Sequence, residues 1–313
     1  MVDQRKIIID TDPGHDDAVA IFTALGSREL RTLGITAVAG NVPLELTARN
    51  SMALCECAGR ADIPVFAGCD RPLKRALVTA EEVHGRTGLD GVSFPMPQMQ
   101  LQPQHAIDFL IDTLRNEPEG TVTLCPLGPL TNVATAMLRA PDIVDRIEQI
   151  VLMGGAYFEV GNVTPTAEFN IYVDPEAAKI VFGSGVQLTV LPLDVTHKAL
   201  TTPKRLDAFR DLGTKQGQVV ADLLATYNRH DTAKYGSEGG PLHDPCVIAY
   251  LLNPELFSGR LVNVEIETES ELTMGMTVVD WWKVTNRSEN AMFISEVDAD
   301  GFFELITEKL ACL

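Results

Sequence analysis

The sequence predicts an α/β fold in which helices cover both faces of a mostly parallel central sheet, as a single domain over residues 1–313. Short runs rich in Ile, Val and Leu alternate with longer segments whose apolar residues recur at helical spacing, and this alternation is typical of parallel sheets. Polar residues follow directly after several of the apolar runs, at the edge where open parallel sheets bind ligands. No internal repeat, linker or low-complexity segment divides the chain.

The predicted strands are short apolar runs, and they lie at residues 7–9, 32–39, 63–66, 121–126, 147–153, 186–193, 261–267, 276–282 and 291–297. Helical spacing predicts helices at residues 15–25, 44–58, 105–116, 130–138 and 245–252, one from residue 174, two within 203–230 and a last one from residue 301. Residues 70–104 are irregular and rich in proline, and a loop of this length in a compact domain often carries function.

Composition and charge restrict the possible partners. With 45% hydrophobic and 22% charged residues, the chain has the composition of a soluble globular protein. Its formal charge is −18 without a basic block, which argues against binding nucleic acid or a membrane and favours a small-molecule ligand. We expect neither a signal peptide nor a membrane span, because the first strand begins at once and no apolar run is long enough. The six cysteines form no Cys-x-x-Cys pair, which favours free thiols and a cytoplasmic location.

The strongest chemical signal is an acidic cluster directly after the first apolar run. Residues 10–17 read DTDPGHDD, so four carboxylates lie within eight residues, around a Pro-Gly turn and the first turn of a helix. Helix capping explains one or two of them, because Asp is a preferred cap. Four crowded carboxylates repel one another unless a cation lies among them, and hard divalent cations prefer oxygen ligands. The cluster therefore favours a metal or active site over capping alone.

Three other signals are weak when each is taken alone. His84 lies in the long loop, where a histidine is often only solvated. His243 and Asp244 precede a proline, and a helix cap is the simpler explanation of this Asp. Glu168 and Asn170 point to the same side if their segment is extended. The sequence contains no phosphate-binding glycine loop of the usual kinds.

Taken together, these motifs resemble those of the nucleoside hydrolases, the calcium-dependent N-ribohydrolases. The resemblance begins at residues 10–17 and continues in the same order through AGN at 39–41, HG at 84–85, TGLDG at 87–91, GPLTN at 128–132, LMGG at 152–155, AEFNI at 167–171, DPEAA at 174–178 and HD at 243–244. So ordered a set is highly specific. It implies the nucleoside hydrolase fold with a Rossmann-like core, and an enzyme that hydrolyses the N-glycosidic bond of ribonucleosides with inversion, giving free base and ribose.

The resemblance also implies a role for each matching residue. It implies Ca²⁺ bound by the side chains of Asp12, Asp17 and Asp244 and by the backbone carbonyl of Leu127. Asp12 would also act as general base toward a metal-bound water. Ribose binding is implied for Asp16, Asn41, Asn162, Glu168 and Asn170. Asp10 would support the turn from behind the ligands.

On the side of the base, the resemblance implies that His243, with His84, stabilises the departing base and that Tyr235 faces it. Purine-restricted relatives lack a histidine at the position of His243, and residues 193–198 (LDVTHK) are similar to the pyrimidine-preferring branch. We therefore expect cytidine and uridine to be preferred, with a role in pyrimidine salvage, and a homo-oligomer, dimer or tetramer. Glu82 stands where that branch usually carries Asn, and residues 229–235 match it only at Tyr235.

Two other functions remain open at this point. A Mg²⁺-dependent phosphohydrolase also carries a nucleophilic Asp after its first strand, and this alternative makes Asp10 essential while giving His243 no role. A catalytically silent nucleoside- or ribose-binding protein would keep the ribose site without turnover.

Overall fold

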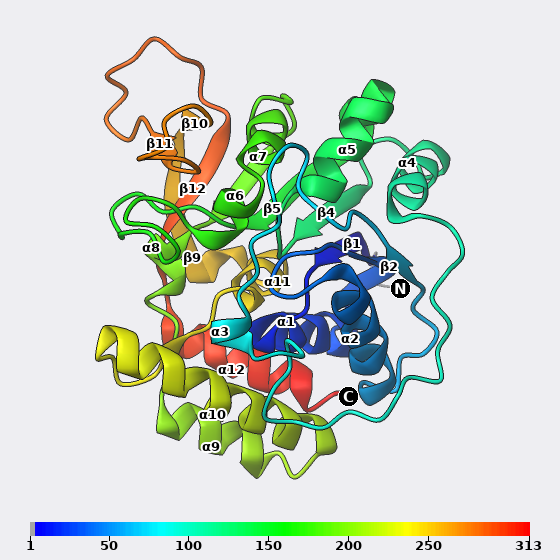
Figure 1. Ribbon diagram of the computed structural model, residues 1–313. Helices are drawn as coiled ribbons and strands as arrows, with labels where there is room; N and C mark the ends of the chain where they lie inside the picture. Colours follow the sequence, from blue (N-terminus) through cyan, green and yellow to red (C-terminus); the bar gives the residue numbers. More distant parts are fainter. Residues whose placement is uncertain (1–3) are drawn as a thin grey trace.

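The computed structural model describes residues 4–313, except for the side chains of residues 229–235. Its centre is an eight-stranded sheet with the order β3-β2-β1-β4-β5-β6-β12-β9 (Figure 1). The strands of this sheet are β1 (Arg5–Thr11), β2 (Leu30–Ala37), β3 (Val65–Ala67), β4 (Val122–Pro126), β5 (Ile147–Met153), β6 (Leu188–Leu191), β9 (Phe257–Val262) and β12 (Ala291–Val297). All neighbouring pairs are parallel except β12 and β9, which run antiparallel at one edge.

The order of the strands places a topological switch point beside β1. From β1 the chain continues outward through β2 and β3 on one side, and then returns to add β4, β5 and β6 on the other. The connections that follow β1 and β4 therefore leave the sheet in opposite directions. In open parallel sheets, ligands bind in the crevice that this divergence opens at the carboxyl ends of the strands.

Helices cover both faces of the sheet. They are α1 (His15–Gly26), α2 (Leu44–Cys57), α3 (Glu81–His84), α4 (Ala106–Asn116), α5 (Thr131–Arg139), α6 (Phe169–Val173), α7 (Pro175–Phe182), α8 (Leu193–Thr196), α9 (Pro203–Asp211), α10 (Lys215–Tyr235), α11 (Pro245–Leu252) and α12 (Ala299–Leu310). Two 3₁₀ turns, Pro141–Arg146 and Pro254–Leu256, and two small antiparallel sheets, β7 (Leu200–Thr201) with β8 (Gly240–Pro241) and β10 (Val264–Ile266) with β11 (Thr277–Val279), complete the described elements.

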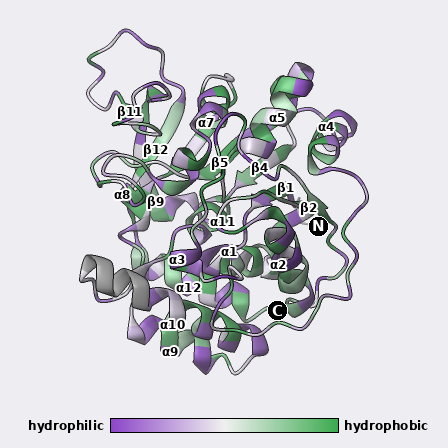
Figure 2. Ribbon diagram, in the orientation of Figure 1, coloured by the Kyte–Doolittle hydropathy of each residue, from purple (hydrophilic) through white to green (hydrophobic). Residues whose placement is uncertain are grey.

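The side chains of β1 point alternately to the two faces of the sheet, and the core accordingly forms two layers. Ile7 and Ile9 pack with α1, α2 and α9–α12 on one face of the sheet, whereas Ile8 packs with α4, α5 and α7 on the other. All three side chains are fully buried. Hydrophobic residues accordingly concentrate along the strands and the inward sides of the helices (Figure 2). This architecture confirms the predicted fold class.

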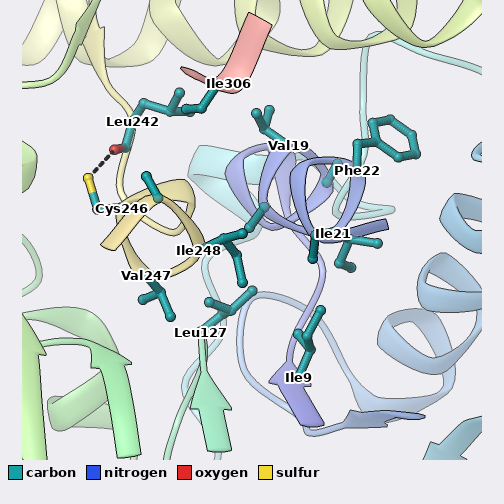
Figure 3. Close-up of a cluster of buried hydrophobic side chains, with 14 of the residues drawn as sticks. Ile9, Val19, Ile21, Phe22, Leu127, Leu242, Cys246, Val247, Ile248 and Ile306 are labelled. Carbon is teal, nitrogen blue, oxygen red and sulfur yellow. Dashed lines mark hydrogen bonds between the residues drawn. The ribbon is translucent and has the colours of Figure 1, made fainter. Parts of the chain in front are cut away.

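The core beneath the carboxyl ends of the strands is formed largely by α1 and α11. Figure 3 shows Ile9 from β1 and Leu127, which follows β4, close to Ile21 of α1 and to Val247 and Ile248 of α11. Packing against the same cluster orients the first turns of these two helices, which carry the acidic residues of the candidate site.

Most predicted elements are present, with small shifts of their ends. The strands predicted at 147–153 and 291–297 agree with β5 and β12. The strand predicted at 63–66 begins two residues later, at Val65, and residues 70–104 contain the short helix α3. The segment at 168–170 is not an extended strand: it opens α6, with Glu168 as the N-cap. All six cysteines are free thiols, and four of them are buried. Within the described residues, no helix combines the length and apolar character needed to cross a membrane.

Candidate active site

A pocket lies at the carboxyl ends of the central strands, and most of the predicted site residues line it. Nine of them do so: Asp16, Asn41, His84, Leu127, Asn162, Glu168, Asn170, His243 and Asp244. Asp12 and Asp17 are fully buried and lie in the hydrogen-bond network behind Asn41. The side chain of Tyr235 lies outside the described residues. The fold therefore gathers segments that are more than 200 residues apart in the sequence.

Asp12 is held in a narrow cradle. Its Oδ2 accepts the backbone N–H of Asn41 at 2.7 Å, while its Oδ1 is buried and has no hydrogen-bond partner among the described residues. A Cβ added at Gly40 or Gly128 would collide with the carboxylate, so only glycine leaves room on these two sides. Burial, followed by the negative charge of Asp17, raises the pKa of Asp12 well above its usual value.

Asp17 combines a helix-capping role with a place in an acidic cluster. It accepts hydrogen bonds from the Thr11 hydroxyl and, at 2.8 Å, from the backbone N–H of Gly14 at the start of α1. Among the described residues, carboxylate oxygens of Asp16, Asp17 and Asp244 lie within 4.8 Å of one another. Capping alone therefore does not explain this group.

Asp244 shows the difference between a cap and a candidate ligand most clearly. It occupies the N-cap position of α11, yet its side chain makes no capping hydrogen bond. Burial, and then the charges of Asp16 and Asp17, raise the pKa of Asp244 well above its usual value. The capping interpretation of Asp244 is thus not supported, and its carboxylate instead joins the cluster.

The donor set fits a hard divalent cation. The carboxylates of Asp12 and Asp244 are repelled by those of Asp16 and Asp17, and a cation among them would relieve this repulsion. The partnerless Oδ1 of Asp12 and the cluster of Asp16, Asp17 and Asp244 supply anionic oxygens. The carbonyl of Leu127, which accepts the Nδ2–H of Asn170 at 2.7 Å, retains a second lone pair. All of these are oxygen donors, as Ca²⁺ and Mg²⁺ prefer.

Amide and carboxylate side chains form a second wall of the pocket. Glu168 accepts the backbone N–H groups of Asn170 at 2.9 Å and Gly155 at 3.1 Å, and burial raises its pKa to about 7. Asn162 accepts the backbone N–H of Phe169 at 2.9 Å, which connects the 157–163 loop to α6. These hydrogen bonds fix the orientation of the polar side chains.

Two histidines and a tyrosine, His84, His243 and Tyr227, form a third wall of the pocket. His84 stacks on Tyr227 with ring centroids 5.5 Å apart, and its Nδ1 lies 3.2 Å from Nδ1 of His15. His243 contacts Thr196, with 2.7 Å between its Nδ1 and the hydroxyl oxygen. Burial, with a smaller contribution from His197, lowers the pKa of His243 to about 3, so this ring is neutral at physiological pH.

Asp10 lies behind the pocket rather than in it. Its Oδ1 accepts hydrogen bonds from Thr36 at 2.5 Å and from Asn132 at 2.7 Å, and burial raises its pKa to about 7. Asp10 does not line the pocket. This position fits a supporting role for Asp10 and offers no exposed nucleophile of the kind that a phosphohydrolase needs.

Several residues around the pocket carried no readable signal in the sequence. Tyr227 lies in the middle of α10, where it stacks on His84. Thr196 is a buried threonine whose hydroxyl contacts His243. Asp194 lies in α8, shortly after the end of β6. In the structure it accepts the backbone N–H groups of Tyr157, Phe158 and Glu159, at 2.9, 2.5 and 3.2 Å, and so anchors the 157–163 loop.

Comparison with known proteins identifies the family. The family model for inosine-uridine preferring nucleoside hydrolases matches residues 7–304. The chain belongs to this family. The nucleoside hydrolase resemblance of its motifs is thereby confirmed, and the chain is an N-glycosyl hydrolase, a ribonucleoside hydrolase, rather than a phosphohydrolase.

Similar sequences and structures cover nearly the whole of this nucleoside hydrolase. An uncharacterised protein of Schizosaccharomyces pombe is 51% identical over 98% of this chain and 99% of its own. A pyrimidine-specific ribonucleoside hydrolase of a Shewanella species is 46% identical over 98% and 96%. Among solved structures, a plant nucleoside hydrolase has a TM-score of 0.92 at 34% identity, covering 99% of both chains. A purine-preferring ribonucleoside hydrolase of Gardnerella vaginalis has a TM-score of 0.91 at 33% identity, covering 98% of both.

Proposed function

We propose that this nucleoside hydrolase acts on pyrimidine ribonucleosides, preferring cytidine and uridine, and that it depends on Ca²⁺. The observation that carries the proposal is the pairing, in one pocket, of a buried acidic cluster with the neutral His243. Cleavage of an N-glycosidic bond leaves positive charge on the ribose and negative charge on the base. The acidic wall favours the first charge, and a hydrogen-bond donor on the histidine wall favours the second.

Asp12, Asp17 and Asp244, with the carbonyl of Leu127, would hold the cation. When bound, Ca²⁺ supplies a positive charge that lowers the pKa of a water ligand and attracts ribose hydroxyls. The pairing of Asp12 with the backbone N–H of Asn41 leaves its second oxygen available, which supports assigning Asp12 as the general base that accepts the proton of the attacking water. Attack from the side opposite to the base inverts the anomeric carbon.

Ribose recognition is assigned to the polar residues near the acidic cluster. Asp16 lines the pocket beside Asp17 and would accept a hydrogen bond from a ribose hydroxyl. Asn41, Asn162, Glu168 and Asn170 would complete the grip, since each lines the pocket and is fixed by a backbone hydrogen bond. Fixing the sugar in this way orients the anomeric carbon toward the water.

The histidine wall is assigned to the leaving base. His243 and His84 line the pocket, and a pyrimidine that departs with negative charge needs donors at this point. The preference for cytidine and uridine is supported by His243 and by the pyrimidine-specific name of the Shewanella relative. Tyr235 remains assigned to the base side on the resemblance alone.

The domain organisation, the oligomeric state and the location of the protein are also proposals. We infer that residues 1–313 form a single catalytic domain, supported by a family match that spans residues 7–304. We further infer a homo-oligomer, a dimer or tetramer, and a role in pyrimidine salvage, both from the family resemblance. A cytoplasmic location is supported by free and largely buried cysteines.

A panel of substrates tests the substrate assignment. Purified protein with excess Ca²⁺ is incubated with uridine, cytidine, inosine and adenosine, and reducing sugar is measured. We expect release from all or some of them, with the highest kcat/KM for the two pyrimidines. A higher kcat/KM for inosine than for uridine would overturn the base preference, and binding of nucleosides without any release would favour the silent binding protein.

A further inference from the structure

The contact between Thr196 and His243 determines which ring nitrogen of His243 carries the proton. Thr196 ends the short helix α8, which follows β6, and its side chain is fully buried. His243 immediately precedes Asp244 at the start of α11, and 92% of its surface is buried, since its exposed fraction is 8%. The Thr196 hydroxyl oxygen lies 2.7 Å from His243 Nδ1. Two segments 47 residues apart therefore meet in one short hydrogen bond.

The environment of the hydroxyl decides which atom donates. Among the described residues, Thr196 Oγ1 has no hydrogen-bond partner other than His243 Nδ1. If Nδ1–H donated, the hydroxyl proton of Thr196 would be buried without an acceptor, which is costly. If the hydroxyl donates, its proton is satisfied and only lone pairs stay unused, which costs less. The hydroxyl therefore donates, and Nδ1 of His243 is the acceptor.

The second ring nitrogen faces the substrate. Within the described part of the chain, His243 Nε2 makes no hydrogen bond, and it does not belong to the buried atoms that lack a partner. His243 lines the pocket, so Nε2 is the ring nitrogen open to it. A ring whose Nδ1 accepts a hydrogen bond keeps a lone pair on that atom, so its proton is on Nε2. The ring thus presents an N–H donor to the pocket.

We propose that Thr196 is a positioning residue that fixes His243 as the Nε2–H tautomer, with this N–H directed at the leaving base. The opposite tautomer would present a lone pair to an atom that gains negative charge in the transition state, and would repel it. The direction of the N–H, set by the fold before the substrate arrives, gives the base a preorganised donor. This inference rests on the proposed function in that it assigns the base, and not the ribose, to His243.

The tautomer can be measured directly by long-range ¹H–¹⁵N correlation NMR on ¹⁵N-histidine protein at neutral pH with Ca²⁺. The signals of His243 are identified among those of the six histidines by their loss in His243→Gln. We expect a pyridine-type Nδ1, shifted by its hydrogen bond, and a pyrrole-type Nε2. In Thr196→Val the Nδ1 signal should move to the position of an unbonded acceptor, and in Thr196→Ser it should keep the wild-type position. A pyrrole-type Nδ1 in the wild type would overturn the proposal.

Kinetics with two leaving groups separates this role from a general structural one. Thr196→Val should lower kcat for uridine about tenfold, the size expected for one impaired neutral hydrogen bond, with Thr196→Ser near the wild type. Hydrolysis of p-nitrophenyl riboside should change by less than about twofold, because nitrophenolate delocalises its charge and needs no donor. The matched control is Thr23→Val, which removes another fully buried threonine hydroxyl, one that donates to the Val19 carbonyl within α1.

The outcomes distinguish this inference from the proposed function. Equal losses for uridine and p-nitrophenyl riboside in Thr196→Val, or no loss for either, would overturn the positioning role. A wild-type protein that releases no sugar from any nucleoside would overturn the proposed function, while the NMR experiment would still decide the tautomer.

Discussion

The two ends of the pocket are built in opposite ways. At one end, the proposed ribose end, carboxylates crowd together behind and beside the pocket, and burial raises the pKa values of Asp12 and Asp244. At the other end, the proposed base end, aromatic rings dominate, and burial lowers the pKa of His243 so that its ring is neutral. The proposed ribose end thus gathers carboxylates that favour binding of a cation, whereas the proposed base end carries the neutral His243. This polarity matches the charges that separate when a glycosidic bond breaks.

The two ends also differ in how the fold holds them. Asp12 and Asp17 come from the turn between β1 and α1, and backbone N–H groups and glycines fix them directly. The base end depends on side chains from α3, α8, α10 and the start of α11, each held by another side chain. We therefore expect substitutions at the ribose end to abolish turnover and those at the base end to reduce it by smaller factors.

The largest effect is expected for Asp12→Asn. The amide still accepts the backbone N–H of Asn41, but it cannot take a proton from water, so kcat should fall about 10²- to 10⁴-fold. Steady-state assays with uridine measure this loss. The melting temperature of the metal-free protein should not fall, because a neutral side chain removes buried repulsion. The control is Asp142→Asn, an exposed carboxylate paired with Arg115, and equal kcat values in the two variants would remove Asp12 as the base.

A smaller effect is expected for Asp194→Asn, which loosens the 157–163 loop. The carboxylate of Asp194 accepts three backbone N–H groups, and an amide would turn its own N–H groups toward some of them. KM for uridine should rise roughly tenfold with less change in kcat, as for the loss of about one charged hydrogen bond. Hydrogen exchange of the amides of residues 157–159 should accelerate. Faster exchange with an unchanged KM would show that this loop does not position the substrate.

The smallest effect that we expect is a dependence of the melting temperature on pH, caused by Glu168. The pKa of Glu168 is raised to about 7 in the folded protein, so the folded state binds its proton more tightly than the unfolded state does. Stability from this group is therefore greatest below its unfolded pKa and is lost as pH rises toward 7. The melting temperature of metal-free protein should fall by a few degrees between pH 5 and pH 8.

Glu168→Gln provides the control for this pH effect. It replaces the carboxyl with a group that does not titrate, so it should flatten the pH dependence. Partial burial raises the pKa of Asp90, but hydrogen bonds outweigh this effect and lower it. The stability that Asp90 contributes is therefore lost as pH falls, at a lower pH than the range of this measurement. An unchanged slope in Glu168→Gln would show that other buried carboxyls, such as Asp10, cause the loss of stability.

The contrast between the two ends of the pocket also explains which features can be predicted from the sequence. The fold class and most elements follow from apolar periodicity, and the acidic cluster is readable because its residues are consecutive. The pairing of Thr196 with His243, the stacking of Tyr227 on His84 and the grip of Asp194 on the loop join distant segments through side-chain packing. No local pattern encodes such contacts. The start of α6 at Phe169 was also not predicted, because Glu168 caps it within an apparently irregular loop.

The most direct test of the central claim measures both products of uridine cleavage as a function of bound metal. Protein is stripped with a chelator, its residual metal is measured by elemental analysis, and Ca²⁺ is then titrated back while free uracil and ribose are quantified. We predict equimolar uracil and ribose, negligible release from the stripped protein, and saturable recovery with Ca²⁺. Full activity in verified metal-free protein, or no release at saturating Ca²⁺, would contradict this account of the acidic cluster.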